Sequence, residues 1–125
     1  MAEKKPLILL VEDEQMIIDL YRLRFDEENY EVLVTDKGSE ALALADKKKP
    51  DIILLDIILP EIDGFGILRE LKSKTSTKKI PVLLLTNLSQ ESDRQKGSDL
   101  GADGYLVKAE HTPAEVVNEI KKILK

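Results

Sequence analysis

Five short apolar runs recur at fairly even spacing along the chain, and stretches with helical periodicity lie between them. The runs are LILLV (7–11), YEVLV (30–34), DIILLD (51–56), IPVLLL (80–85) and GYLV (104–107). Four of these runs are nearly continuous rather than alternating, which is typical of strands buried on both faces of a parallel sheet. The pattern therefore predicts five strands separated by helices.

The stretches between the runs predict helices because their apolar residues recur every three or four positions. The last helix has the clearest start, since Thr112 and Glu115 form a T-x-x-E capping box around Pro113. Each helix is expected to turn one apolar stripe toward the sheet. The expected inward residues are Met16, Ile17, Leu20 and Leu23, then Ala41, Leu42 and Ala45, then Ile67, Leu68 and Leu71, and finally Val117, Ile120 and Leu124.

The order of elements is βα repeated five times, which predicts a (βα)5 fold of the α/β class. Such a fold has a five-stranded, mostly parallel sheet, helices on both faces and right-handed crossovers. No second composition regime, repeat or linker interrupts the sequence, so residues 1–125 are interpreted as a single domain. Ligands of such sheets bind beyond the carboxyl ends of the strands, which makes the residues directly after each strand the first candidates for a site.

Composition narrows the available chemistry. The 19 basic and 24 acidic residues give a formal charge of −5, which argues against direct binding of nucleic acid or anionic lipid. Without cysteine, and with His111 as the only histidine, the chain lacks thiolate sites, disulfides and histidine metal pairs. No apolar run approaches the ~18 residues of a membrane span, and the first run is too short for a signal peptide. A cytoplasmic protein without membrane contact is expected.

Charged and polar side chains follow each of the five predicted strands, but Thr35 and Asp36, at the end of the second strand, have no assigned role. The other four strands provide the candidate site residues. They are Glu12 and Asp13 after the first strand, Asp56 after the third, Thr86 after the fourth and Lys108 after the fifth. Taken singly, each has a structural alternative: acids cap helices, threonine is a common strand residue, and lysine is commonly a solvated charge. Taken together, three carboxylates, a hydroxyl and an ammonium converge on one rim of the sheet.

Three carboxylates at one place repel one another, so either one of them is protonated or a cation joins them. Magnesium prefers oxygen ligands and needs few protein carboxylates, which suits this acid cluster; calcium would require more protein oxygens. Asp56 then stands charged beside a metal and can act as a nucleophile that forms an aspartyl phosphate. Lys108 and the metal would neutralise the phosphoryl oxygens while Thr86 donates a hydrogen bond.

Four motifs resemble the receiver domain of two-component response regulators, and the resemblance covers nearly the whole chain. The motifs are LVEDE (10–14), the D-x-x-x-P-x-x-D-G pattern of Asp56, Pro60, Asp63 and Gly64, LLLT ending at Thr86, and GADGYLVK ending at Lys108. The resemblance implies a flavodoxin-like arrangement of the (βα)5 fold, with the strand order 2-1-3-4-5.

The resemblance also implies the roles of the rim residues. Asp56 is expected to accept a phosphoryl group from a phosphohistidine on a sensor histidine kinase or a histidine phosphotransfer protein. Thr86 and Lys108 are expected to contact the phosphoryl oxygens. Mg²⁺ is the expected cofactor, with direct ligation by two carboxylates and partly water-mediated ligation by Glu12. Its implied ligands are Glu12, Asp13, Asp56 and the backbone carbonyl of Ile58.

A conformational switch is the expected response to phosphorylation. Tyr105 occupies the position of the family's switch aromatic, although it can also be read as a packing residue with its hydroxyl at the surface. The fourth helix (89–101) has Leu100 as its only large apolar residue and contains Gly97, which predicts weak packing. We therefore expect Thr86 and Tyr105 to shift the surface of the fourth helix, fifth strand and fifth helix, where downstream partners bind.

Three positions depart from the family pattern. Glu12 stands where an aspartate is common. Asn87 stands where a small residue is usual, and its larger side chain is expected to alter access to the phosphoryl group. Ala109 replaces the proline that commonly follows the lysine. A cis bond before a non-proline residue costs ~2.5–4 kcal/mol, so the bond between Lys108 and Ala109 is predicted to be trans.

Two other functions stay open. A turnover enzyme of the haloacid dehalogenase class would carry a second aspartate at the position of Ile58, so a phosphoacceptor that assists its own phosphorylation and dephosphorylation is favoured over a turnover enzyme. The alternative on the same fold is a receiver-like interaction module that does not accept phosphate. The sequence shows no output domain after the fifth helix and identifies neither the downstream partner nor a phosphorylation-dependent homodimer.

Overall fold

The computed structural model describes residues 5–59 and 63–124, so Pro60 of the D-x-x-x-P-x-x-D-G motif lies outside the described residues. Strands and helices alternate along the chain, with one short 3-10 helix, η1, before the last α-helix. The elements are β1 (Leu7–Val11), α1 (Gln15–Glu27), β2 (Glu31–Thr35), α2 (Gly38–Lys48), β3 (Ile52–Leu55), α3 (Gly64–Ser73), β4 (Val82–Thr86), α4 (Glu91–Asp99), β5 (Gly104–Val107), η1 (Lys108–Glu110) and α5 (Pro113–Leu124).

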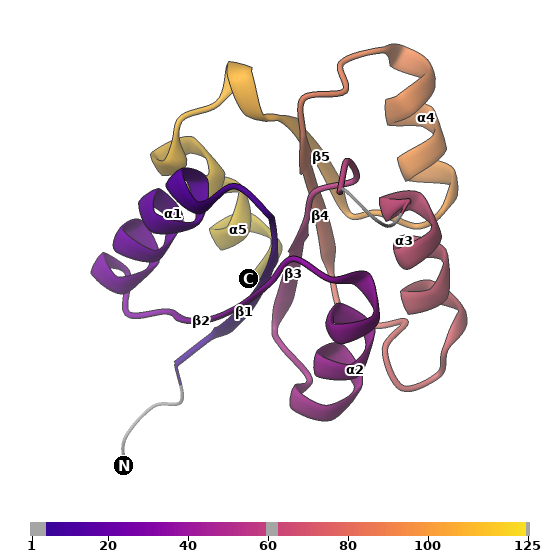
Figure 1. The fold of residues 1–125 in the computed structure, drawn as a ribbon, viewed down its shortest axis with the longest axis horizontal. Helices are drawn as coiled ribbons and strands as arrows, with labels where there is room; N and C mark the ends of the chain where they lie inside the picture. The colour runs from indigo at the N-terminus through magenta and orange to yellow at the C-terminus, as the bar shows by residue number, and fades with distance from the viewer. Residues whose placement is uncertain (1–4, 60–62, 125) are drawn as a thin grey trace.

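The five strands form one parallel sheet in the order β2-β1-β3-β4-β5, which confirms the expected flavodoxin-like fold. Helices α1 and α5 cover one face of the sheet, and α2, α3 and α4 cover the other (Figure 1). Val11 pairs with Leu55, and Thr86 pairs with Val107. This register brings the carboxyl ends of β1, β3, β4 and β5 to the same edge of the sheet.

The central strands are fully buried because helices pack on both of their faces. All residues of β3 and β4 are buried, whereas β2, at the edge of the sheet, is mostly half-buried. The structure also confirms the expected apolar stripes of α2, α3 and α5, and the capping box of α5 forms in both directions between Thr112 and Glu115. Among the described residues, no helix has the length and apolar character that crossing a membrane requires.

The predicted inward face of α1 is wrong. Ile18, Tyr21 and Phe25 are buried, Ile17 is half-buried, and the other three expected residues, Met16, Leu20 and Leu23, are exposed. The helix carries two apolar stripes, and periodicity alone does not choose between them. The stripe with the two aromatic rings, which stack 5.8 Å apart, faces inward because it buries the larger apolar area. The second stripe is left on the surface.

Helix α4 packs as weakly as its sequence predicts, and Gly97 is its only buried residue. The glycine has a packing role that sequence reasoning missed. A Cβ atom at Gly97 would lie 2.7 Å from Leu84 Cδ1 and 3.3 Å from Tyr105 Cδ2. The absence of a side chain therefore lets α4 lie close to β4 and β5.

Candidate functional site

Asp56 lies at the carboxyl end of the central strand β3, and its side chain is almost fully buried. Its backbone N–H donates to Val11 O at 3.1 Å, which continues the pairing of β3 with β1. Its Oδ1 accepts a hydrogen bond from the Ile58 N–H at 2.9 Å. The backbone thus fixes the carboxylate in one orientation at the rim, where it is available for chemistry.

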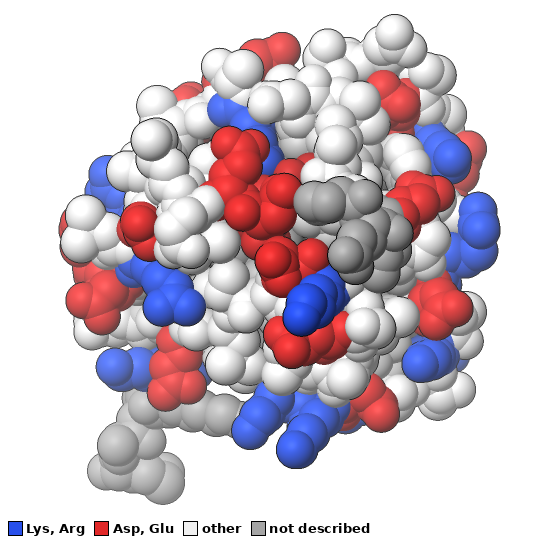
Figure 2. Space-filling view, in the orientation of Figure 1, with Lys and Arg blue, Asp and Glu red and all other residues white. Residues whose placement is uncertain are grey.

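The two acidic residues after β1 meet Asp56, as the sequence predicts. One carboxylate oxygen from each of Glu12, Asp13 and Asp56 lies within 4.8 Å of the others. Glu12 is buried and Asp13 is exposed, so the cluster opens to solvent on one side. Figure 2 shows acidic side chains gathered near the middle of this face. The donor set contains only oxygen atoms, and this chemistry suits a hard divalent cation such as Mg²⁺.

Lys108 joins the cluster from the end of β5. Its Nζ donates to Asp56 Oδ2 at 2.8 Å and also to Glu12 Oε1. Burial pushes the pKa of Lys108 down, but the hydrogen bonds to Asp56 and Glu12 outweigh this effect and raise the pKa above its usual value. The ammonium is therefore positively charged at neutral pH. Sequence reasoning brought Lys108 to this rim but did not foresee its bond to Glu12.

Burial and the neighbouring charges strongly shift the pKa of Glu12. Burial raises its pKa to about 7, and the neighbouring charge of Asp56 adds to this rise, whereas Lys108 opposes it. Near neutral pH, with no metal bound, Glu12 is thus close to the midpoint of its titration. The raised pKa of Glu12 and the ammonium of Lys108 both reduce the repulsion among the three carboxylates.

Two residues of the D-x-x-x-P-x-x-D-G motif, Asp63 and Gly64, lie at the start of α3 next to the site. Asp63 caps α3, and its Oδ1 accepts from the Phe65 N–H at 3.0 Å. Gly64 packs so closely that a Cβ atom there would collide with the Ile57 backbone. Ile58 pairs with Asp63 in an isolated bridge, and its side chain is exposed. Asp63 and Gly64 thus lie against Ile57 and Ile58, and the latter is the expected backbone ligand next to Asp56.

Thr86 and Tyr105 lie on neighbouring strands and both contact the loop between β4 and α4. The Thr86 hydroxyl is buried and accepts from the Leu88 N–H at 3.4 Å. The Tyr105 hydroxyl donates to Leu88 O at 2.7 Å, and the Arg94 guanidinium lies 5.2 Å from the ring centroid. The half-buried Tyr105 ring packs beside the last strand, as the packing interpretation expects, and its hydroxyl is in addition bonded to the loop.

The two departures after Thr86 and Lys108 contact each other. Asn87 Oδ1 accepts a hydrogen bond from the Ala109 N–H at 3.1 Å. No peptide bond in the described part of the chain is cis, which confirms the predicted trans bond between Lys108 and Ala109. Sequence reasoning noted both residues but missed their contact. The available signal was that alanine, unlike the family's proline, has an N–H to donate.

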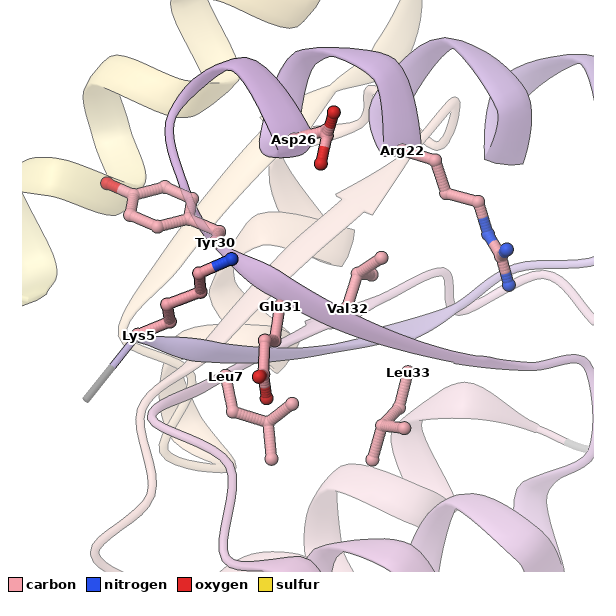
Figure 3. Close-up of a pocket in the computed structure, with 8 residues that line it drawn as sticks. All are labelled: Lys5, Leu7, Arg22, Asp26, Tyr30, Glu31, Val32 and Leu33. Atoms are coloured by element: carbon pink, nitrogen blue, oxygen red, sulfur yellow. The ribbon is translucent and has the colours of Figure 1, made fainter. Parts of the chain in front are cut away.

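A further cavity lies elsewhere. It has a volume of about 460 Å³ and is lined by the first residues of β1 and β2 and by polar residues of α1, including Arg22 and Asp26 (Figure 3). These residues are at the amino ends of the strands, on the side of the sheet away from Asp56. The cavity brings together no rim residue, so the convergence of charges after the strands remains the best candidate for the site.

Comparison with known proteins agrees with this geometry. The family model of the response regulator receiver domain matches residues 8–121. The chain belongs to this family. The match spans both the acid pair after β1 and the lysine after β5, so the receiver domain contains every rim residue considered above.

Individual relatives support the same assignment. The receiver domain is 37% identical over 118 residues, or 94% of its length, to the alkaline phosphatase synthesis transcriptional regulatory protein PhoP of Bacillus subtilis, of which it covers 48%. It resembles the structure of a putative response regulator from Chloroflexus aurantiacus J-10-fl with a TM-score of 0.89 and 33% identity, covering 97% and 98% of the two chains.

A third comparison concerns the metal. The receiver domain of sensor histidine kinase PA1611 from Pseudomonas aeruginosa PAO1, described with a magnesium ion coordinated in its active site cleft, has a TM-score of 0.86 and 26% identity. The two chains are covered to 97% and 98%. The chain spans about half the length of the curated relatives that it matches, so the likeness to them concerns their receiver part alone.

Proposed function

We propose that this receiver domain accepts a phosphoryl group on Asp56 from a phosphohistidine. The observation that carries the proposal is the position of the Asp56 carboxylate, which is held at the strand ends between two further carboxylates and the Lys108 ammonium. A buried acid with an adjacent cation and a solvent-facing acid beside it has the arrangement that phosphoryl transfer requires. A merely structural aspartate would not need this surrounding charge.

The transfer is a displacement at phosphorus. An Asp56 carboxylate oxygen forms a bond to phosphorus while the bond from phosphorus to the histidine nitrogen breaks, and its electron pair returns to the imidazole. Negative charge is spread over the three equatorial phosphoryl oxygens. The Lys108 ammonium, already bonded to Asp56, and the Thr86 hydroxyl at the neighbouring strand end are suited to stabilise that charge.

The cofactor proposed for this reaction is Mg²⁺. Glu12, Asp13 and Asp56 provide a set of oxygen donors close enough to share one ion, and the backbone carbonyl of Ile58 is proposed as a fourth ligand. The magnesium ion described in the Pseudomonas aeruginosa receiver domain supports this assignment. When bound, the ion supplies positive charge that offsets the repulsion between the acid cluster and an incoming phosphoryl group.

The proposed donor is a histidine kinase or a histidine phosphotransfer protein, and it must reach the rim. Helix α1 begins directly after the acid pair and exposes the stripe of Met16, Leu20 and Leu23, and Ile58 is exposed beside Asp56. A protein donor can bury these side chains, which a small phosphodonor cannot. The direct partner is therefore proposed to be a protein, with neither nucleic acid nor membrane in contact with this domain.

The proposed output is a shift of the surface formed by α4, β5 and α5, and a downstream protein or output domain binds there. Thr86 and Tyr105 link this surface to the site, because both side chains bond to Leu88 in the loop before α4. The domain is proposed to assist the gain and loss of its own phosphoryl group. It is not proposed to turn over free substrates.

Intact mass spectrometry tests the proposal directly. The wild-type domain, incubated with acetyl phosphate and Mg²⁺, is expected to gain one phosphoryl group, and Asp56→Asn is expected to gain none. Asp63→Asn is the matched control, because asparagine retains the helix cap and the change removes a different carboxylate near the site. This control is expected to be phosphorylated like the wild type.

Three results would overturn the proposal. If neither acetyl phosphate nor a panel of phosphorylated histidine donors modified the wild-type domain, the phosphate-independent interaction module would become the better interpretation. If the domain instead released phosphate repeatedly from generic phosphomonoesters, it would be an enzyme. An adduct that persists in Asp56→Asn would place the acceptor elsewhere.

A further inference from the structure

Asn87 and Ala109, the residues that follow Thr86 and Lys108, are joined although they are 22 positions apart. The last register pair between β4 and β5 is Thr86 with Val107. The hydrogen bond from the Ala109 N–H to Asn87 Oδ1 thus ties the two segments together beyond the end of the sheet, where backbone pairing has stopped.

We propose that Asn87 is a positioning residue that, through Ala109, fixes Lys108 relative to Thr86. This inference rests on the proposed function, in which a phosphoryl group is held between these two side chains. Each partner of the bond is covalently next to one of them. Shortening or loosening the link changes the gap between the hydroxyl and the ammonium without removing either group.

The link depends on both departures from the family pattern. Proline at position 109 would have no N–H to donate, and a small apolar residue at position 87 would have no oxygen to accept it. The bond between Tyr105 and Leu88 ties the same loop to β5, but it involves a side chain that is proposed to move. The bond of Asn87 is independent of that ring, so it can hold Lys108 in either state of the switch.

A mutant cycle tests the link. Asn87→Leu is compared in the wild-type and Ala109→Pro backgrounds, and the affinity for beryllofluoride in the presence of Mg²⁺ is measured by calorimetry. Loss of one exposed hydrogen bond is expected to weaken binding about two- to fivefold in the wild-type background. In the Ala109→Pro background, where the bond is already absent, Asn87→Leu is expected to change nothing.

The affinity for Mg²⁺ alone separates positioning from a general loss of structure. This affinity depends on the acid cluster and is expected to be equal in the wild type and Asn87→Leu. An equal loss of beryllofluoride binding in both backgrounds, or a parallel loss of Mg²⁺ binding, would overturn the proposal, because Asn87 would then act by another route.

The amide exchange rate of Ala109, measured by NMR, reports the link without any phosphoryl analogue. It is expected to rise several-fold in Asn87→Leu and to stay at the wild-type level in Asn87→Asp, which keeps an acceptor oxygen. Unchanged exchange in Asn87→Leu would show that the link does not exist. If neither the wild type nor Asp56→Asn bound beryllofluoride, the proposed function would fail. The exchange rate of the Ala109 amide would still show whether the hydrogen bond between Ala109 and Asn87 exists.

Discussion

Helices α3 and α4 follow neighbouring strands and cover the same face of the sheet, but they are held there very differently. Helix α3 buries five residues, among them Phe65, Ile67, Leu68 and Leu71. Helix α4 buries only Gly97, and otherwise consists of polar and charged residues. Asp56, the proposed phosphoacceptor, lies before the well-packed helix, whereas Thr86, with the loop bonded to Tyr105, lies before the weakly packed one.

This difference indicates how one domain can both hold a reactive group and transmit a signal. Asp56 requires fixed geometry, and the buried strand β3 with the anchored helix α3 provides it. Elements with little buried apolar surface rearrange at low cost, and α4 is such an element. We therefore expect the loss of a buried apolar side chain to cost more stability in α3 than in α4, and we expect α4 to be the element that changes conformation.

The largest effect is expected from truncating the core of α3. Leu68 is completely buried, and Leu68→Ala is expected to lower the free energy of unfolding by about 2–5 kcal/mol through lost burial and a cavity. Leu100→Ala, at the half-buried end of α4, is the matched control and is expected to cost less than half as much. Urea denaturation of both variants measures the difference, and equal losses would break the comparison.

At the cluster of Glu12, Asp13 and Asp56, the contribution of charge to stability can be separated from that of packing. Because the pKa of Glu12 is raised from 4.5 to about 7, the folded domain binds more protons than the unfolded chain between these values. Its stability therefore falls as the pH rises through this window. Glu12→Gln, measured by thermal unfolding in a chelator, is expected to be more stable than the wild type above pH 7 by roughly 1–2 kcal/mol.

The gain from Glu12→Gln is expected to disappear as the pH falls toward 4.5, because Glu12 then becomes protonated in the unfolded chain as well as in the folded domain. A gain that is the same at all pH values would point to packing rather than charge. This result would remove the electrostatic explanation for the rim.

Replacing a glycine by alanine is expected to raise the free energy of unfolding at Gly66 in α3 and to lower it at Gly97 in α4. A Cβ atom added at Gly66 in α3 would meet no atom of another element within 4 Å, so Gly66→Ala is expected to add about 0.5–1 kcal/mol of stability through helix propensity. Gly97→Ala gains the same propensity but meets Leu84 and Tyr105, and overpacking costs roughly 1–3 kcal/mol. A net loss of about 1 kcal/mol, measured by urea denaturation, is expected from these two effects. If both changes stabilised the domain, α4 would be able to move away from β4 and β5 without a cost in stability.

A change of similar size is expected at Tyr105. Tyr105→Phe removes the hydrogen bond to Leu88 O and is expected to cost about 0.5–1.5 kcal/mol, measured by urea denaturation. Amide chemical shifts should change in the loop before α4 and in β5, and they should stay constant in α3. Shift changes that spread into α3 would show that the two regions are coupled rather than distinct.

Much of the fold was predictable from sequence because the central strands are buried on both faces. Such strands produce continuous apolar runs, and the parallel connection brings their ends to one edge, so the rim residues could be placed together without a structure. The face of α1 could not be predicted, since Leu20 and Tyr21 belong to two competing apolar stripes. Only the fit of Tyr21 and Phe25 into the core decides between them.

Contacts between distant residues were the other limit. The sequence placed Lys108 at the rim, but whether its ammonium bonds to Glu12, Asp56 or solvent depends on side-chain geometry that periodicity does not contain. The contact between Asn87 and Ala109 is of the same kind, because each residue alone looks like an ordinary exposed substitution. Gly97 likewise reads as a weak helix residue until Leu84 and Tyr105 are seen against it.

The most direct test of the central claim is backbone relaxation dispersion by NMR, recorded with and without beryllofluoride and Mg²⁺. We expect millisecond exchange in residues 86–108 of the free domain, a shift of that exchange on adding the phosphoryl analogue, and no exchange in α3 in either state. Exchange that is absent from residues 86–108 in both states, or equally strong in α3, would contradict the division between a fixed acceptor region and a mobile signalling region.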